Sequence, residues 1–417
     1  MELRKTGEIE FVQGGVCAAE GFRAWGVQCG LTHAGAIPTR GKNDLAMIAA
    51  DGECSAAAVY TTNKVKGAPI LVTKKHLEDG KARAVIVNSV NANTCNPDGV
   101  EKAEQMCKLT AKVLGIEAED VIVASTGVIG QPLPIEPIAA AIPALAEGLS
   151  YDGNTEAVRA IMTTDTMPKE VAVRFKIGKK TCTLGGMLKG SGMIHPNMAT
   201  TLTFLTTDAD ISPELLQLAL SDVVKVTLNR VSVDGDTSTN DMVCVMASGK
   251  AGNHRITSEG KDFGTFVNAL YCVLLNLGRM MARDGEGATK LIECVVSGAA
   301  TEEDAVTVAK SVITSSLFKT MIFGEDANAG RIYCAIGYAD ADIDMTRVDI
   351  DIASAAGKIA VGRQGCLVDY SEQQAKAILS EDEIQVLITL GAGTQSAASW
   401  GCDLSYDSVK INGDYRS

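Results

Sequence analysis

The sequence has few aromatic residues, few histidines and no excess of basic residues. Aromatic side chains make up 4% of the 417 residues, and four histidines occur, which leaves little material for a histidine-based catalytic triad or a three-histidine metal site. The 38 Lys and Arg are outnumbered by 51 Asp and Glu, for a net charge of −13. This balance argues against a general nucleic-acid binder and against a polybasic membrane-surface protein, because both need surplus cations.

Motifs for metals, nucleotides and membranes are also missing. None of the 12 cysteines lies in a CxxC pair or beside a histidine, so we interpret the thiols as buried small hydrophobic residues in a reducing cytosol. The spacing of Gly35–Lys42 does not fit a phosphate-binding loop, and Ser396 replaces the last glycine of a dinucleotide motif that begins at Gly391. The start of the chain has no apolar signal segment, and no run approaches roughly 18 apolar residues. We therefore expect a cytoplasmic protein that uses no metal or nucleotide.

Short apolar runs and segments with helical periodicity alternate along the chain. Continuous or alternating apolar runs predict strands at Pro69–Thr73, Ala84–Asn88, Val121–Ala124, Glu170–Ile177, Glu293–Ser297, Arg331–Ile336 and Ile384–Leu390. Helical spacing of apolar residues predicts helices at Val100–Gly115, Pro134–Leu149, Pro213–Leu228, Asp262–Met281, Glu302–Ser311 and Glu372–Leu379. This mixture predicts a layered α/β fold, with a functional boundary near residue 200.

The most informative segment is an irregular loop, Lys189–Ala199, that leads into an apolar strand at Thr200. A strained turn can bring a hydroxyl onto the preceding carbonyl carbon, and the resulting N→O acyl shift cleaves the chain. An N-terminal Thr200 would then have a hydroxyl nucleophile and its own α-amine as the adjacent base. Such an amine titrates near ~7.7–8. Taken without further information, a loop that simply ends in a strand is the alternative.

Segment Lys189–Ala209 strongly resembles the self-cleavage motif of the ornithine acetyltransferase (glutamate N-acetyltransferase) family. Further stretches that resemble this family, in the same order, are Val59–Asn63, Asn88–Asn93, Ala124–Gly130, Thr163–Thr166, Ser232–Asp241, Asp284–Lys290 and Val409–Ser417. The resemblance implies a layered α-β-β-α fold of the ornithine acetyltransferase and aminopeptidase kind, with helices flanking two sheets. It also implies two chains from one self-cleaved precursor, residues 1–199 and residues 200–417.

The resemblance assigns roles to single residues. Cleavage would fall between Ala199 and Thr200, and Thr200 would be the nucleophile that carries the acetyl group. Thr126 and Gly127 would form the oxyanion hole, which suits a hydroxyl and a glycine N–H that can both donate to developing negative charge. The substrate-binding positions would be Thr163, Lys189, Thr200, Glu286, Asn412 and Ser417.

Some of these assignments have simpler alternatives. Lys189 and Glu286 suit a substrate with opposite charges, but on their own they would be solvated loop residues. Thr163 is chosen from the Thr163–Thr166 run by its motif position. Asp234, Asp236 and Asp241 are expected to be turn and helix-cap residues, because the bidentate glutamate of a calcium loop is missing.

One position departs from the family pattern. Val90 stands where glycine is usual, and a β-branched residue would be strained there if the backbone needs a positive φ.

We therefore expect a glutamate N-acetyltransferase of arginine biosynthesis that moves acetyl from N2-acetyl-L-ornithine to L-glutamate by a ping-pong mechanism through acetyl-Thr200. No cofactor is expected, and the sequence leaves open whether acetyl-CoA is a second donor. The resemblance also implies a heterotetramer of two α and two β chains. The alternatives are an N-terminal-nucleophile amidohydrolase or aminopeptidase, which passes the acyl group to water, and a catalytically silent binding protein.

Overall fold

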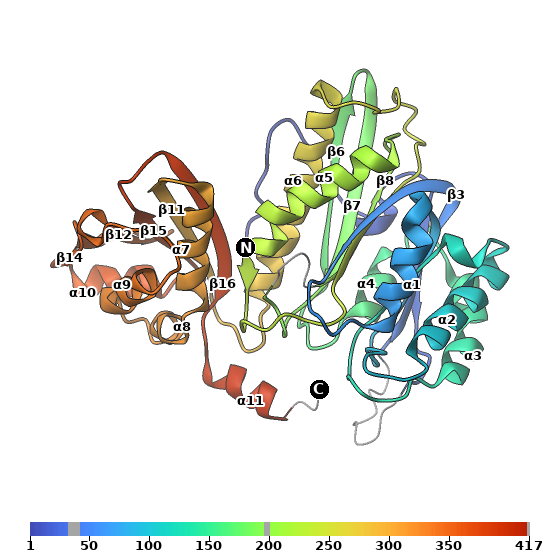
Figure 1. Ribbon diagram of the computed structural model, residues 1–417, viewed down its shortest axis with the longest axis horizontal. Coiled ribbons are helices and arrows are strands. Elements are labelled where there is room, and N and C mark those ends of the chain that lie inside the picture. Colours follow the sequence, from blue (N-terminus) through green and yellow to red (C-terminus); the bar gives the residue numbers. More distant parts are fainter. Residues whose placement is uncertain (32–41, 196–200, 415–417) are drawn as a thin grey trace.

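The computed structural model describes residues 1–31, 42–195 and 201–414 (Figure 1). The described residues form a nine-stranded sheet and a seven-stranded sheet, both with helices packed against them. The layered α/β class that the sequence predicted is therefore confirmed.

The first sheet has the strand order β1-β6-β7-β8-β10-β3-β4-β5, and β2 pairs with β3. Its strands are β1 (Glu10–Val12), β2 (Phe22–Val27), β3 (Leu45–Tyr60), β4 (Lys81–Asn88), β5 (Val121–Ser125), β6 (Lys169–Ile177), β7 (Lys180–Lys189), β8 (Leu202–Thr207) and β10 (Met242–Ala247). Strand β8 pairs antiparallel with β7 and parallel with β10. The parts of the chain before and after residue 200 are thus neighbours in the middle of one sheet.

Helices cover the first sheet on both faces. The segments concerned are α1 (Ala68–His76), α2 (Gly99–Leu114), α3 (Ile135–Gly148), α4 (Asn154–Ile161), α5 (Pro213–Val226) and α6 (Lys261–Arg283). Apolar residues of α5 and α6 share a core with β6, β7 and β10. Residues of α4 pack with the alternate side chains of β8 and β10. Because successive strand residues point to opposite faces, these are the two sides of the sheet.

The second sheet has the strand order β14-β13-β12-β15-β11-β16-β9. Its strands are β9 (Val231–Ser232), β11 (Leu291–Ala299), β12 (Asp349–Ser354), β13 (Gly357–Arg363), β14 (Cys366–Leu367), β15 (Glu383–Thr389) and β16 (Gln395–Cys402). Its core is shared with α7 (Glu302–Thr314), α8 (Ser316–Phe323), α9 (Ala329–Gly337) and α10 (Glu372–Leu379). The last described element is α11 (Tyr406–Asp414).

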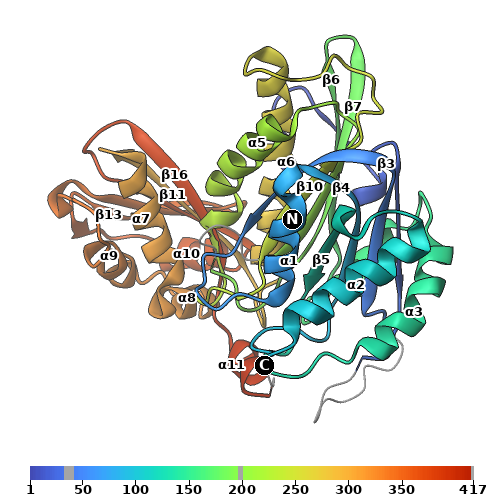
Figure 2. The same cartoon turned by 45° about the vertical axis from the view of Figure 1, so that its right-hand side comes forward.

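Helix α6 joins the two sheets. It contacts β6 and β7 of the first sheet and β11 and β16 of the second, and it stands between them in Figure 2. By length and composition α6 could cross a membrane, but 72% of its apolar window is buried inside the structure. It therefore has the environment of a core helix.

The predicted helices are all present, and two predicted strands are wrong. Pro69–Thr73 lies in α1, and Arg331–Ile336 lies in α9. A short apolar run does not distinguish a buried strand from a buried helix. Pro69 occupies the first turn of α1, where its fixed φ suits a helix start. In α9 the buried residues are Ala329, Ile332, Ala335 and Ile336, and their spacings of three and four are helical.

The interpretation of the cysteines is correct only in part. All 12 are free thiols, and most are buried or half-buried. Cys95, Cys334 and Cys366 are exposed, so the expectation of buried thiols is wrong at these three positions.

Candidate active site

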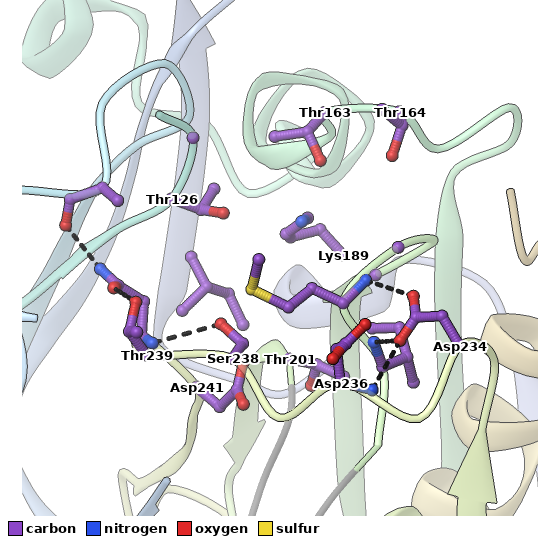
Figure 3. Close-up of a pocket in the computed structure, with 18 of the residues that line it drawn as sticks. Thr126, Thr163, Thr164, Lys189, Thr201, Asp234, Asp236, Ser238, Thr239 and Asp241 are labelled. Atoms are coloured by element: carbon purple, nitrogen blue, oxygen red, sulfur yellow. Dashed lines mark hydrogen bonds between the residues drawn. The ribbon is translucent and has the colours of Figure 1, made fainter. Parts of the chain in front are cut away.

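A cavity of about 280 Å³ lies where β7 ends and β8 begins. The predicted site residues that line it are Thr126, Gly127, Thr163, Lys189, Glu286 and Asn412. Figure 3 shows Thr163 and Thr164 on one side, Lys189 near the centre, and the 234–241 loop on the opposite side. Segments far apart in the sequence are thereby brought together. Ala199, Thr200 and Ser417 lie outside the described residues, but Thr201 and Leu202 line the same cavity.

Thr126 and Gly127 directly follow the C-terminal end of β5. The N–H of Thr126 donates to the carbonyl of Asn88 (3.0 Å), and none of the described hydrogen bonds uses the N–H of Gly127. Gly127 has φ +123°, and a Cβ there would lie 2.1 Å from the carbonyl oxygen of Val90. Only glycine fits this position. The Thr126 hydroxyl and the Gly127 N–H are the donors that this turn can offer to the cavity.

The departure at Val90 is accommodated. Val90 is not among the described non-glycine residues with positive φ. Its carbonyl accepts a hydrogen bond from the N–H of Val128 (3.0 Å), so the valine lies in an ordinary backbone region. The strain considered for this position is absent, and the left-handed conformation belongs to Gly127 instead.

Lys189 is the last residue of β7 and is 8% exposed. Within the described part of the chain, no hydrogen bond or ion pair involves its ammonium group. Burial lowers the pKa of Lys189, and the positive charge of Lys169 adds to this effect. A buried ammonium that faces a cavity is well suited to bind a carboxylate.

Asp165, Lys169 and Asp284 form a buried ionic cluster that is hydrogen-bonded to residues lining the cavity. The Lys169 Nζ lies 2.7 Å from Asp165 Oδ1 and 2.5 Å from Asp284 Oδ2. Asp165 also accepts hydrogen bonds from the N–H groups of Thr163 (3.0 Å) and Gly190 (2.8 Å). Burial alone would raise the pKa of Asp165, but Lys169 and Lys189 together hold that pKa well below its usual range. The cluster therefore fixes two walls of the cavity at once.

The loop with Glu286 is fixed in a similar way. The Ser191 hydroxyl donates to the carbonyl of Asp284 (2.7 Å), and the N–H of Glu286 donates to the carbonyl of Ser191 (3.0 Å). The C-terminal segment packs on the same loop, since the Ser405 hydroxyl donates to the carbonyl of Gly287 (2.6 Å). A Cβ at Gly287 would lie 2.2 Å from the N of Ser408. This close approach of α11 brings Asn412 to the cavity.

Asp234 and Asp241 of the 234–241 loop have different environments. Asp234 accepts hydrogen bonds from the N–H groups of Met193 (2.6 Å), Ile194 (2.9 Å) and Asp236 (3.0 Å), as expected of a turn residue. Asp241 is 4% exposed and lines the cavity, and its Oδ2 is buried without a hydrogen-bond partner. Because strand β10 and not a helix follows Asp241, the helix-cap part of its assignment is wrong. No group of His, Cys, Asp or Glu in the described residues is arranged to hold a metal ion.

The sequence reasoning missed other residues that shape the site. The Asn240 amide donates to the carbonyls of Ala92 (2.6 Å) and Ser125 (2.9 Å), and its oxygen accepts from the Thr94 hydroxyl (2.6 Å). It thereby joins three loops at the oxyanion-hole end of the cavity. Lys169 was missed too. Its sequence signal is weak, since a lysine at the start of an alternating strand is usually exposed.

Two comparisons of the sequence with known proteins indicate the same family. Residues 24–417 match the ArgJ family. A protein of Caldanaerobacter subterraneus named arginine biosynthesis bifunctional protein ArgJ is 48% identical over 410 residues, which are 98% of this chain and 100% of that protein.

Two solved structures are also similar. The Bacillus halodurans arginine biosynthesis bifunctional protein ArgJ is 46% identical with a TM-score of 0.48, over 50% of this chain and 97% of that one. The Mycobacterium tuberculosis ornithine acetyltransferase complexed with ornithine is 37% identical with a TM-score of 0.42, over 46% and 100% of the two chains. Since the family match spans nearly the whole sequence, this chain belongs to the ArgJ family.

Proposed function

We propose that this chain is a glutamate N-acetyltransferase of arginine biosynthesis, which transfers acetyl from N2-acetyl-L-ornithine to L-glutamate. One observation carries the proposal: the described residues expected to form the oxyanion hole and the substrate site line one cavity, at the start of β8. The relationship to a protein named for arginine biosynthesis supports the proposal over 98% of the chain.

The reaction begins with the chain's own cleavage between Ala199 and Thr200. The freed α-amine of Thr200 then takes the proton of its hydroxyl, whose oxygen attacks the acetyl carbon of N2-acetyl-L-ornithine. Thr126 and Gly127 donate to the oxyanion that develops. Ornithine leaves, acetyl-Thr200 remains, and the α-amine of glutamate takes the acetyl group in the reverse sequence of steps. L-glutamate thus enters an active site in which Thr200 already carries the acetyl group.

Substrate binding divides between a positive and a negative side of the cavity. The buried Lys189 pairs with the substrate carboxylate, and Glu286 pairs with an ammonium group. Thr163 and Asn412 add hydrogen bonds, and Ser417 completes the set from the C-terminal end. Both substrates have the α-carboxylate that Lys189 binds. The ammonium group that Glu286 binds is the δ-ammonium of N2-acetyl-L-ornithine, since the α-nitrogen of that substrate is acylated.

The proposal includes a second reaction and an assembly. The relative is named a bifunctional protein, which supports two activities. The second reaction in this proposal is the direct acetylation of glutamate from acetyl-CoA, the donor that the family resemblance leaves open. Residues 1–199 and 200–417 form the α and β chains of a cytoplasmic heterotetramer, with no metal or resident cofactor. The two chains stay together because β8 is hydrogen-bonded to β7 across the cleavage point.

Mass spectrometry under denaturing conditions tests the cleavage. The chain of 43.6 kDa should give fragments of about 20.8 and 22.8 kDa, the second with an N-terminal threonine, and Thr200→Ala should stay intact. Ornithine release from N2-acetyl-L-ornithine is then measured with and without glutamate. Release that depends on glutamate supports transfer. Equal release without glutamate supports an amidohydrolase, and no release from a cleaved protein supports a binding protein.

A further inference from the structure

Asp241 has a carboxyl oxygen that the fold does not use. The residue lies immediately before β10 and lines the cavity, and its Oδ2 has no hydrogen-bond partner in the described part of the chain. A buried polar atom without a partner costs free energy, and such atoms are rare in folded proteins. The free oxygen therefore indicates a hydrogen-bonding group that enters the cavity from outside.

The position of Asp241 is set by the pairing of β8 and β10. These strands are parallel with Met242 opposite Leu202, and the N–H of Met242 donates to the carbonyl of Thr201 (2.8 Å). Asp241 therefore lies across from Thr201 on the neighbouring strand (Figure 3). Neighbouring strands are about 4.8 Å apart. Thr201 directly follows the proposed nucleophile in the sequence, and Asp241 and Thr201 line the same cavity.

The surroundings of Asp241 favour a carboxyl group that carries a proton. Burial raises the pKa of Asp241 well above its usual value, the Ser238 hydroxyl and the Lys189 ammonium oppose this shift, and Asp234 adds to it. Lys189 and Asp234 are the charged groups that act on it from β7 and from its own loop. A carboxylic acid with a raised pKa is suited to give and take a proton during turnover.

The other acidic residues of the cavity are less suited to this task. The Asp234 oxygens accept three backbone N–H groups, and Asp236 is exposed. Glu286 is half-exposed and has the proposed binding role. Asp241 combines burial, an unused oxygen and a place next to the start of β8.

We propose that Asp241 is a further catalytic residue, which exchanges a proton with the nitrogen atom that leaves from or attacks the acetyl carbon. The inference rests on the proposed function. In the first half-reaction the Thr200 oxygen bonds to the acetyl carbon, the hydroxyl proton passes to the α-amine of Thr200, the C–N bond breaks, and the departing nitrogen takes the proton of Asp241.

The second half-reaction reverses this. The neutral amine of glutamate bonds to the acetyl carbon and gives a proton to the Asp241 carboxylate. The Thr200 oxygen then leaves with the proton of its own ammonium group. Each group ends in its starting protonation state. While Asp241 is ionised, the Lys189 ammonium and the Thr200 ammonium offset its charge.

The test compares Asp241→Asn with the matched control Asp222→Asn, an exposed carboxyl on α5. The asparagine variant should cleave itself, bind N2-acetyl-L-ornithine with a KM near that of the wild type, and lose about 10²–10⁴-fold in kcat, the range typical of a lost acid or base. The control variant Asp222→Asn should cleave itself and keep the wild-type KM and kcat.

A pH profile separates this role from a structural one. The rate of the ornithine burst without glutamate should fall on the alkaline side as Asp241 loses its proton. This descending limb should vanish in Asp241→Asn and move in Asp241→Glu. An asparagine variant with transfer within about threefold of wild type, or with an unchanged limb, overturns the proposal.

Two further outcomes keep the test decisive. If Asp241→Asn blocks cleavage, the profile of Asp241→Glu decides: a shifted limb supports the role, and an unshifted limb contradicts it. The other outcome is a wild-type protein that cleaves itself but releases ornithine equally with and without glutamate. This outcome contradicts the proposed transfer to glutamate but not the role of Asp241. The pH profile of the ornithine burst still tests that role.

Discussion

Lys169 and Asp284, which lie before and after the proposed cleavage point in the sequence, form a buried ion pair with 2.5 Å between Nζ and Oδ2. Lys169 belongs to the segment before residue 200 and Asp284 to the segment after it. Asp165 lies on the other side of the same ammonium, 2.7 Å away. One cation therefore links the two halves and fixes the loops that line the cavity.

We expect Lys169→Met to destabilise the fold strongly. The substitution leaves Asp165 and Asp284 buried without their cation, and loss of one partner of a buried pair costs about 3–5 kcal/mol. The free energy of unfolding by urea measures this cost. The control is Lys225→Met, which breaks the exposed Lys225–Asp222 pair and should cost about 0–1 kcal/mol. Equal losses in the two variants would contradict the role of the cluster.

Acid should weaken the same cluster. The folded pKa of Asp165 is below its usual value, so its contribution to stability is present above the unfolded pKa of about 3.9. That contribution is lost as the pH falls through the folded pKa. We expect Asp165→Asn to flatten the decline in Tm below about pH 4. A decline with the same slope in both proteins would exclude Asp165 as a source of acid sensitivity.

The contribution of Asp241 to stability should depend on pH in the opposite direction from that of Asp165. Its folded pKa is above the unfolded one, so between the two values the folded state binds more protons and stability falls as the pH rises. We expect Asp241→Asn to be more stable than wild type at pH 7, by roughly 1–3 kcal/mol if the amide satisfies the buried position better. Thermal unfolding at pH 5 and at pH 8 checks this. If the stability of Asp241→Asn relative to wild type is no greater at pH 8 than at pH 5, the raised pKa of Asp241 is not the cause of the difference.

Gly127→Ala should damage the oxyanion hole. A Cβ at this position lies 2.1 Å from the Val90 carbonyl oxygen, so the turn must move. Losing one oxyanion donor lowers kcat by about 10²–10³-fold. Gly130→Ala is the control, because Gly130 also has a positive φ (+75°) but a Cβ there meets nothing within 4 Å. Steady-state kinetics should show a kcat loss in the first variant and near-normal activity in the second.

Lys189→Met should weaken substrate binding more than folding. The ammonium is buried and has no described partner to leave behind, while a hydrogen-bonded charge contributes about 1.5–3 kcal/mol to the groups it binds. We expect KM for both amino acids to rise roughly 10- to 100-fold. Exposed Lys179 provides the control, Lys179→Met, with unchanged KM. A KM near the wild-type value would show that Lys189 does not bind the substrate carboxylate.

Part of this site could be predicted from the sequence, and the rest depends on tertiary structure. Motif resemblance selected Thr126, Thr163 and Lys189, and the cavity brings them together. The importance of Lys169 comes from packing against residues more than 100 positions away, and Asp241 differs from Asp234 only in what surrounds it. The wrong strand prediction at Pro69–Thr73, which lies in helix α1, has a similar cause. An apolar run is buried whether it forms a strand or a helix, so its sequence alone does not distinguish the two.

The place of β8 in the first sheet has a consequence for refolding. This strand is held between β7 and β10, so a single precursor forms the β7–β8 ladder as an intramolecular event with a high effective concentration. Once the chain is cut, the same ladder must form between separate molecules. The mature enzyme should therefore re-form the β7–β8 ladder after denaturation at a rate that depends on protein concentration. Uncut Thr200→Ala should re-form this ladder at a rate that does not depend on concentration.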